Sequence, residues 1–187
     1  IIMDVLNDNP KEYIEFLQKA GNNEDTEVVH YAVTAMVEIS KENDYKLQEF
    51  ERQFSLNPDD ITVLNQYTDF LWNCLSQNLM QGQVEVLNRE LFSSLIQKKI
   101  ALVNPGIDDF KRAIENELKR KNFTQASITL REMKKLYPDS EEYYLSRLDY
   151  LASLGRGDDI KSLINEIYKR NIFLSSKTKE VLAFWEA

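Results

Sequence analysis

Residues 107–140 read IDDFKRAIENELKRKNFTQASITLREMKKLYPDS, and residues 141–174 read EEYYLSRLDYLASLGRGDDIKSLINEIYKRNIFL. The two stretches match in length and in the placing of their apolar side chains. The pairs that occupy equivalent positions are Phe110 and Tyr144, Ala126 and Ile160, Leu130 and Ile164, and Met133 and Ile167. A period of about 34 residues is typical of helical hairpins that stack on one another. The question for function therefore becomes what this array binds.

The stretch upstream keeps the hairpin pattern but not the period. Asn57-Pro58-Asp59-Asp60 predicts a turn and a helix cap. We expect a helix from Ile61 to about Met80 and another from Val84 to about Val103, which ends at Asn104-Pro105-Gly106. The interval from Pro58 to Pro105 is much longer than the interval from Pro105 to Pro138. This unit is therefore predicted to have elongated helices or an enlarged connection around residues 77–83.

Residues 1–56 predict a helical hairpin. Asn9-Pro10 is typical of a helix start, and Gly21-Asn22-Asn23 of a helix end. Tyr13, Ile14, Phe16 and Leu17 are expected on the inward face of this helix. Asp25 or Thr26 would cap the next helix, whose apolar residues recur at steps of three and four. Residues 41–44 are either a break in that helix or a solvated part of it; we favour one helix to about Leu56, because no Gly or Pro interrupts it.

Two family resemblances accompany this pattern. Leu64, Tyr67, Thr68 and Leu71, together with the units at 107–174, resemble tetratricopeptide (TPR) repeats, and residues 25–36 (DTEVVHYAVTAM) resemble the second helix of a HEAT-type repeat. The resemblances imply an all-α, right-handed helical-hairpin solenoid, a TPR-like superhelix with a HEAT-like N-terminal hairpin and a C-terminal capping helix. We expect a single domain, 1–187, made of a HEAT-like hairpin at 1–56, an irregular TPR-like unit at 57–106, TPR-like units at 107–140 and 141–174, and a capping helix at 175–187. That last helix begins at Ser175-Ser176 and carries Val181, Leu182, Phe184 and Trp185.

Composition agrees with a helical globular chain. It is 43% hydrophobic and 29% charged, with five Gly and four Pro, which suits long helices joined by short connections. No apolar run approaches the roughly 18 residues of a membrane helix, so we expect no direct membrane span. The net charge of −8 divides into −7 for residues 1–50, −2 for 51–100 and +1 for 101–187. A nucleic-acid partner is not expected, because binding phosphates needs a basic face.

Residues able to support chemistry are scarce. One histidine, His30, and one cysteine, Cys74, cannot build a His/Cys metal site or a nucleophile–histidine pair from nearby positions. Cys74 lies among leucines, so we expect a buried thiol, and a lone cysteine fits a reducing compartment. We therefore expect no enzyme, no metal and no cofactor. An active site made of carboxylates alone stays open as an alternative.

The TPR resemblance implies that the first helix of each hairpin lines a groove. The residues on that groove would be Asn65, Asp69, Trp72, Asn73, Lys111, Glu115, Lys119, Leu145 and Asp149. A mixed polar groove with one tryptophan suits a peptide or helix of a protein partner; the alternative is a solvated face. The expected function is a non-enzymatic, cytoplasmic protein–protein interaction scaffold. A self-association module that forms homo-oligomers is the alternative.

A narrower resemblance rests on three short segments. Leu6-Asn7-Asp8-Asn9-Pro10, His30-Tyr31-Ala32 and Leu182-Ala183-Phe184-Trp185 resemble the soluble repeat domain of PelE-type proteins, which are membrane-anchored components of bacterial exopolysaccharide export. The resemblance implies that the partner is another component of a membrane-bound synthase complex. It also implies a tether to the membrane, with transmembrane helices in a segment upstream of Ile1.

Overall fold

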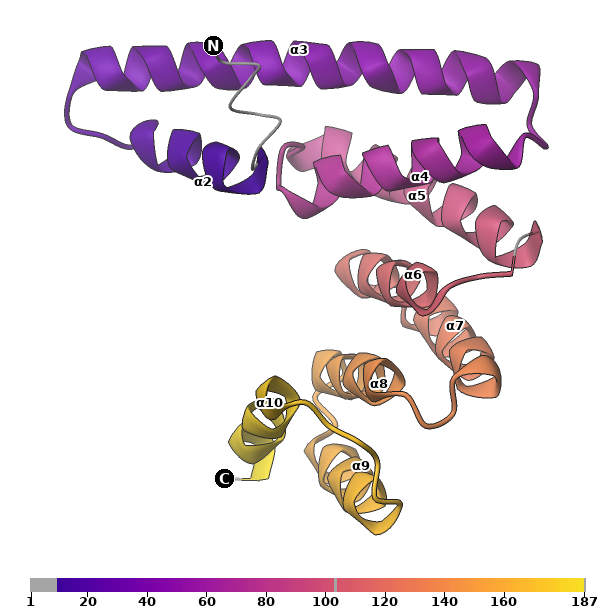
Figure 1. The fold of residues 1–187 in the computed structure, drawn as a ribbon. Coiled ribbons are helices and arrows are strands. Elements are labelled where there is room, and N and C mark those ends of the chain that lie inside the picture. The colour runs from indigo at the N-terminus through magenta and orange to yellow at the C-terminus, as the bar shows by residue number, and fades with distance from the viewer. Residues whose placement is uncertain (1–9, 103, 187) are drawn as a thin grey trace. The chain divides into compact units, whose positions relative to one another are not determined.

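The computed structural model describes residues 10–102 and 104–186, which form nine α-helices and no strand (Figure 1). The expectations for Leu6–Asn9 and Val103 fall outside these described residues. Contacts within the chain divide it into two compact units, Ile1–Asn88 and Arg89–Ala187. Each unit is described by itself, and the single domain 1–187 stays a prediction.

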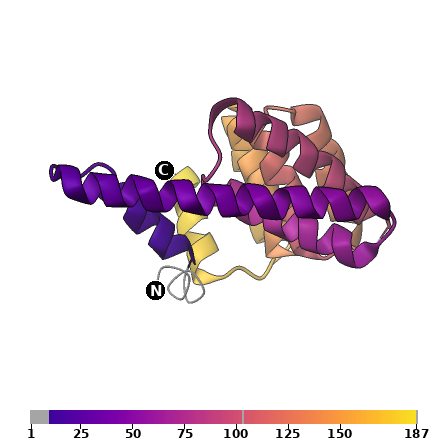
Figure 2. The same cartoon turned by 90° about the horizontal axis from the view of Figure 1, so that it is seen from above.

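The first unit is built on one long helix. Its helices are α2 (Pro10–Ala20), α3 (Thr26–Leu56), α4 (Ile61–Ser76) and the start of α5 (Gly82–Leu102). The structure confirms that α3 is uninterrupted over its 31 residues (Figure 2). The carboxylate of Asp25 caps it by accepting a hydrogen bond from the Glu27 N–H at 2.9 Å. The polar stretch at residues 41–44 stays helical because nothing in it removes a backbone hydrogen bond.

Helices α2 and α4 cover different halves of α3, along the same side of it (Figure 1). Near the N-terminal half of α3, Leu17 of α2 packs with Ala32 and Ile39. Near the C-terminal half, the cover comes from α4 and is aromatic. The Phe50 ring stacks on Tyr67 with centroids 5.7 Å apart. One helix therefore obtains its core from two separate partners.

Helix α4 ends at Ser76, short of the predicted end at Met80. Asn78 adopts a left-handed conformation with φ 55°, and the Leu79 N–H bonds the Cys74 carbonyl at 3.3 Å. Asparagine tolerates this conformation better than most residues, so the helix stops here. Both alternatives for the irregular unit are confirmed. The connection between α4 and α5 is enlarged, and α5 is long, with 21 residues against 13 or 14 in α6–α9.

Cys74 is buried in α4, with 2% of its surface exposed, as predicted. Loss of water around the thiol raises its pKa to about 11. The nucleophilic thiolate is therefore rare at neutral pH.

We expect iodoacetamide at pH 8 to alkylate Cys74 at least about 100-fold more slowly in the native chain than in urea, because a pKa raised by about two units lowers the thiolate fraction by that factor. Mass spectrometry of the labelled chain measures the two rates. Equal rates would show that the α3–α4 core opens readily.

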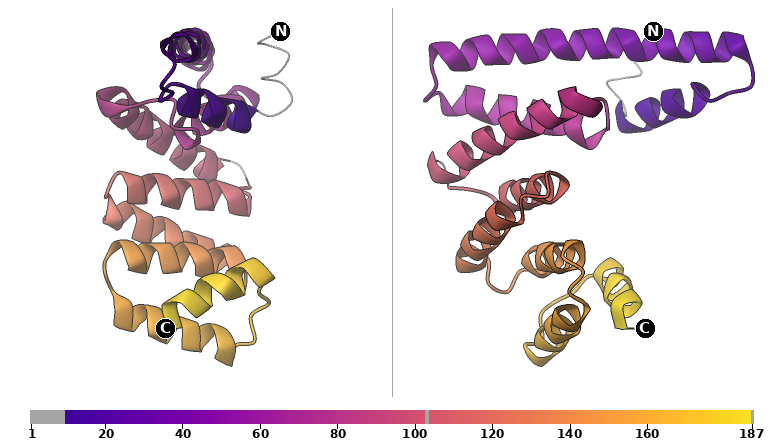
Figure 3. Two further views of the ribbon diagram at one scale, coloured as in Figure 1. Left: turned by 90° about the vertical axis from the view of Figure 1, so that its left-hand side faces the viewer. Right: turned by 180° about the vertical axis from the view of Figure 1, so that it is seen from behind.

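The second unit stacks its helices in sequence-adjacent pairs. After α5 come α6 (Ile107–Lys119), α7 (Phe123–Leu136), α8 (Glu141–Ser153), α9 (Gly157–Lys169) and α10 (Ser176–Glu186). Helices α6 and α7 pair, as do α8 and α9, and α8 also contacts α6 and α7 (Figure 3, left). All eight apolar positions that match between the two hairpins are buried. The pattern that predicted the hairpins is therefore the pattern of their core.

A buried polar cluster joins the middle of α5 to α6. The Asn116 amide donates to the Arg89 carbonyl at 3.0 Å, and the Ser93 hydroxyl donates to the Glu117 carboxylate. Glu117 is fully buried, and its charge is paired with Arg120 at 2.8 Å. Buried charges are tolerated only when they are paired and hydrogen-bonded in this way.

The two hairpin turns of this unit have the same backbone geometry. Lys121 and Gly155 occupy equivalent positions of the two hairpins, and both have positive φ, 58° and 67°. The residue after each turn donates its N–H back to the preceding helix, from Asn122 to Glu117 at 2.9 Å and from Arg156 to Leu151 at 3.0 Å. The period therefore extends to the backbone bonds that close each hairpin, although one turn has glycine and the other lysine.

We expect Lys121→Gly to raise the free energy of unfolding by about 0.5–1 kcal/mol, because glycine adopts positive φ without the strain that a side chain brings. The converse change, Gly155→Ala, should lower it by a similar amount. An added Cβ at Gly155 meets no heavy atom within 4 Å, so only the backbone is strained. Urea titration measures both variants. A stabilisation by Lys121→Ala equal to that of Lys121→Gly would show that the lysine charge, and not φ, is responsible.

The final helix covers α9, as predicted for a cap. Leu182 is 1% exposed and joins the core with Leu174, and Trp185 is partly buried against it. The helix also carries Val181 and Phe184, which are exposed. Ser175 caps the helix, because its Oγ accepts the Thr178 N–H at 3.3 Å.

Candidate partner-binding groove

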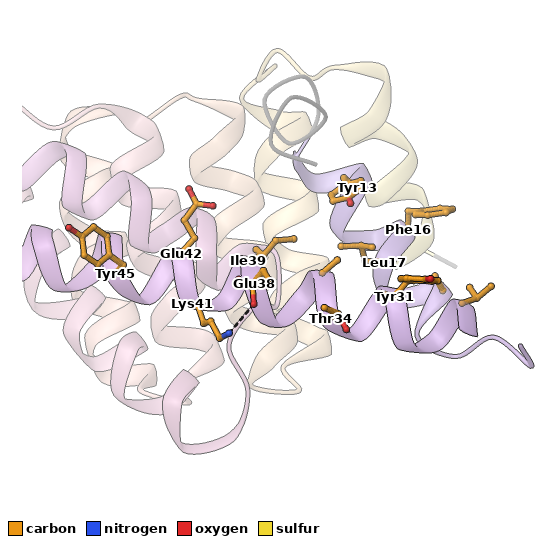
Figure 4. A pocket seen from close by; sticks show the side chains of 14 residues that line it. Tyr13, Phe16, Leu17, Tyr31, Thr34, Glu38, Ile39, Lys41, Glu42 and Tyr45 are labelled. Atoms are coloured by element: carbon orange, nitrogen blue, oxygen red, sulfur yellow. Dashed lines mark hydrogen bonds and ion pairs between the residues drawn. The ribbon is translucent and has the colours of Figure 1, made fainter. Parts of the chain in front are cut away.

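An open apolar groove of about 730 Å³ lies between α2 and α3 in the first unit (Figure 4). Its residues are mostly aromatic and aliphatic. Helix α2 contributes Tyr13, Phe16, Leu17 and Ala20; helix α3 contributes Val28, Tyr31, Ala32, Thr34, Ala35, Glu38, Ile39, Lys41, Glu42 and Tyr45.

The floor of the groove is packed core, and its walls are exposed aromatic rings. Leu17, Ala32 and Ile39 hold the floor together and are at most 7% exposed. Phe16 and Tyr31 stand beside them with 64% and 65% of their surfaces exposed. The prediction that Phe16 faces inward is therefore wrong. It is one position before Leu17, about 100° around the helix, so its ring points away from the floor and stays exposed.

The α3 side of the groove follows a stripe with alternating steps of three and four. The stripe contains Val28, Tyr31, Ala35, Glu38, Glu42 and Tyr45. This spacing is that of a helix surface that packs against another helix. Helix α2 covers the neighbouring line through Ala32 and Ile39 and leaves much of this stripe open.

The polar groups of the groove are few and local. Glu38 pairs with Lys41 at 2.9 Å (Figure 4). Glu42 pairs with Lys46, also at 2.9 Å and also within α3. Exposed pairs of this kind contribute little to stability. The Thr34 hydroxyl donates to the His30 carbonyl one turn earlier. Because apolar groups dominate, the chemistry that this groove offers is the burial of a partner's apolar side chains.

The groove residues predicted from the repeat pattern fall in both units. On α4, Asn65 and Trp72 are half-buried, and Asp69 and Asn73 are exposed. The Asn65 Oδ1 is buried and has no hydrogen-bond partner among the described residues. An unpaired buried acceptor of this kind typically costs about 1–3 kcal/mol.

The other predicted residues lie on α6 and α8. Loss of water around Asp149 on α8, and then the negative charge of Glu115 on α6, raise the pKa of Asp149. Lys111 pairs with Asp108 on its own helix at 3.3 Å. Lys119 is exposed and Leu145 is half-buried. The groove that these residues would form with α4 stays a prediction.

Among residues 10–102 and 104–186, no group of three or more His, Cys, Asp or Glu side chains is placed to hold a metal ion. No helix within those ranges combines the length and apolar character needed to cross a bilayer. His30 is exposed, and its ring centroid lies 6.1 Å from that of Tyr31.

Comparison of the chain with protein-family models, curated proteins and solved structures finds no match. The candidate site is therefore argued from its own residues.

We expect Phe16→Ser and Tyr31→Ser each to change the free energy of unfolding by no more than about 0.5 kcal/mol, because both rings are already in water. Leu17→Ala, in the floor, should lower it by about 2–4 kcal/mol. Thermal or urea unfolding compares the three variants. A loss as large for Phe16→Ser as for Leu17→Ala would show that the rings stabilise the fold and are not a free surface.

Proposed function

We propose that this protein is a non-enzymatic protein-interaction scaffold whose α2–α3 groove binds a segment of a partner protein. The exposed aromatic walls of the groove carry this proposal. Apolar side chains that gather on a surface and contribute little to folding mark interaction sites, and aromatic residues dominate interface energetics. Phe16, Tyr31 and Tyr45 meet both descriptions, with 64–73% of their surfaces exposed.

The helical architecture supports the same interpretation. Helices that pack in sequence-adjacent pairs, with a repeating pattern of core positions in the second unit, suit a repeat array whose exposed faces bind partners. We propose that the pairs continue as a right-handed, TPR-like superhelix with a HEAT-like first hairpin. The predicted surface on α4, α6 and α8 is then a second contact region. A single cysteine, buried and unreactive, fits a cytoplasmic location.

The resemblance to PelE-type proteins suggests one setting for the scaffold. In that setting the partner is a component of a membrane-bound exopolysaccharide synthase complex. Purification of such a complex with this chain as a stoichiometric subunit would support the setting. A complex that assembles equally well without the chain would remove it.

Self-association is the second candidate, because an exposed apolar groove also fits a second copy. The charge of the first unit opposes it. Residues 1–88 carry five Lys or Arg and sixteen Asp or Glu, a net charge of −11. Two such units repel each other at close range.

The groove predicts a specific effect of Tyr31→Asp on partner binding. We expect partners recovered with the wild-type chain to fall by about tenfold or more with this variant, because a charge would have to be buried against apolar groups. Affinity purification with quantitative mass spectrometry measures the change. Phe173→Asp is the matched control, since Phe173 is 85% exposed and lies outside the groove.

Trp72→Ala and Lys111→Glu test the second contact region in the same experiment. If Tyr31→Asp leaves the recovery of partners unchanged and these two variants abolish it, the binding site is the surface predicted on α4, α6 and α8. Recovery unaffected by all of them would overturn both assignments.

A further inference from the structure

The shape of the groove favours a helix over an extended peptide. An extended segment binds mainly by hydrogen bonds to an exposed strand edge. The groove is formed by α2 and α3, whose central N–H and C=O groups bond within each helix. A helical occupant needs no such partners, because its own backbone is satisfied internally.

The open stripe of α3 sets the size of the occupant. Val28 and Tyr45 mark its ends, about 17 residues and about 26 Å apart along the helix. A helix of about 18 residues matches this length, and apolar side chains spaced three and four apart would meet Tyr31 and Tyr45.

Two acidic residues interrupt the apolar stripe in its middle. Glu38 and Glu42 are consecutive members of the stripe, with apolar or aromatic members on both sides. Their lysine partners come from α3 itself and are at least half exposed, so these pairs hold the carboxylates weakly. An apolar residue facing the two carboxylates would remove water from them without adding a new partner. A lysine or arginine there would pair with them.

The net charge of the first unit also favours a partner with Lys or Arg. Residues 1–88 have a net charge of −11, whereas residues 89–187, with eighteen Lys or Arg and fifteen Asp or Glu, have +3. The acidic unit is the one that holds the groove. It attracts a cationic segment and repels both an acidic one and a second copy of itself.

We propose that the α2–α3 groove binds an amphipathic helix of another protein that presents apolar side chains at its ends and Lys or Arg at its centre, facing Glu38 and Glu42. This inference rests on the proposed scaffold function and names the chemistry of the partner. The acidic pair sets the register, and the aromatic walls supply most of the affinity.

The test uses the full chain and a displayed library of helical peptides of about 18 residues. Selection is for binding to the wild type and against binding to Tyr31→Asp, so that groove-dependent peptides are enriched. We expect these peptides to be net positive, with central Lys or Arg between apolar positions three and four apart. Their Kd should rise several-fold between roughly 50 and 500 mM salt, because the central charges are screened.

Charge reversal then locates the contact. Glu38→Lys with Glu42→Lys should weaken the selected synthetic peptides by about tenfold or more, the equivalent of about 1.4 kcal/mol. The matched control is Glu24→Lys with Glu51→Lys, which changes the net charge equally at exposed sites outside the groove. It should change Kd by less than about threefold, within the effect of long-range charge alone.

The other outcomes separate the two proposals. Groove-dependent peptides that are acidic, or that bind equally after reversal at Glu38 and Glu42, would overturn this inference and leave the scaffold function standing. Sedimentation that shows a wild-type dimer abolished by Tyr31→Asp would make a second copy the occupant and also overturn it. No groove-dependent enrichment at all, with a monomeric chain, would overturn both.

Discussion

An α-helix satisfies its own backbone but can bury only one stripe of side chains without help, so each helix of this chain depends on neighbours for cover. In residues 89–187 the lengths of the paired helices match: α6 to α9 have 13 or 14 residues each, and α6 pairs with α7 as α8 pairs with α9. In residues 1–88 they do not. Helix α3, about 46 Å long, is covered over one part by α2, about 16 Å long, and over another by α4. The open groove runs along the flank of α3 beside the line of residues that α2 covers.

The sequence predicts much of the second unit because one pattern determines both its core and its turns. The apolar positions that recur from one hairpin to the next are the buried ones, and even Lys121 takes the conformation that Gly155 takes one period later. At the end of α4 the apolar spacing predicts the wrong boundary. Leu79 and Met80 continue the apolar spacing and are buried or partly buried, but they are buried from a non-helical connection. The burial pattern alone does not tell whether Leu79 and Met80 are helical. The left-handed backbone of Asn78 ends the helix before them, and asparagine is only one of several residues that allow this conformation.

The candidate site could be predicted only in part, for a related reason. Phe16 and Tyr31 have the apolar character and the spacing of core residues, and periodicity does not tell whether a neighbour arrives to cover them. The nine groove residues drawn from the repeat pattern all lie on α4, α6 and α8, and the groove itself stays a prediction. The repeat pattern does not predict that Lys111 pairs within its own helix, or that the charge of Glu115 raises the pKa of Asp149.

Helix α3 packs with α2 near one end and with α4 near the other. Because its backbone is unbroken, the number of residues between these two contacts fixes their relative direction around the helix axis. Ile39, which packs with α2, and Phe50, which packs with α4, are eleven residues apart, close to three whole turns, so both point to the same side. One residue inserted among 41–44 would rotate α2 by about 100° relative to α4 and carry the groove away from its present side. Lys41 and Asp44 of that polar stretch are exposed, and Glu42 and Asn43 are half-buried. The fold therefore constrains the number of residues in this stretch more strictly than their types.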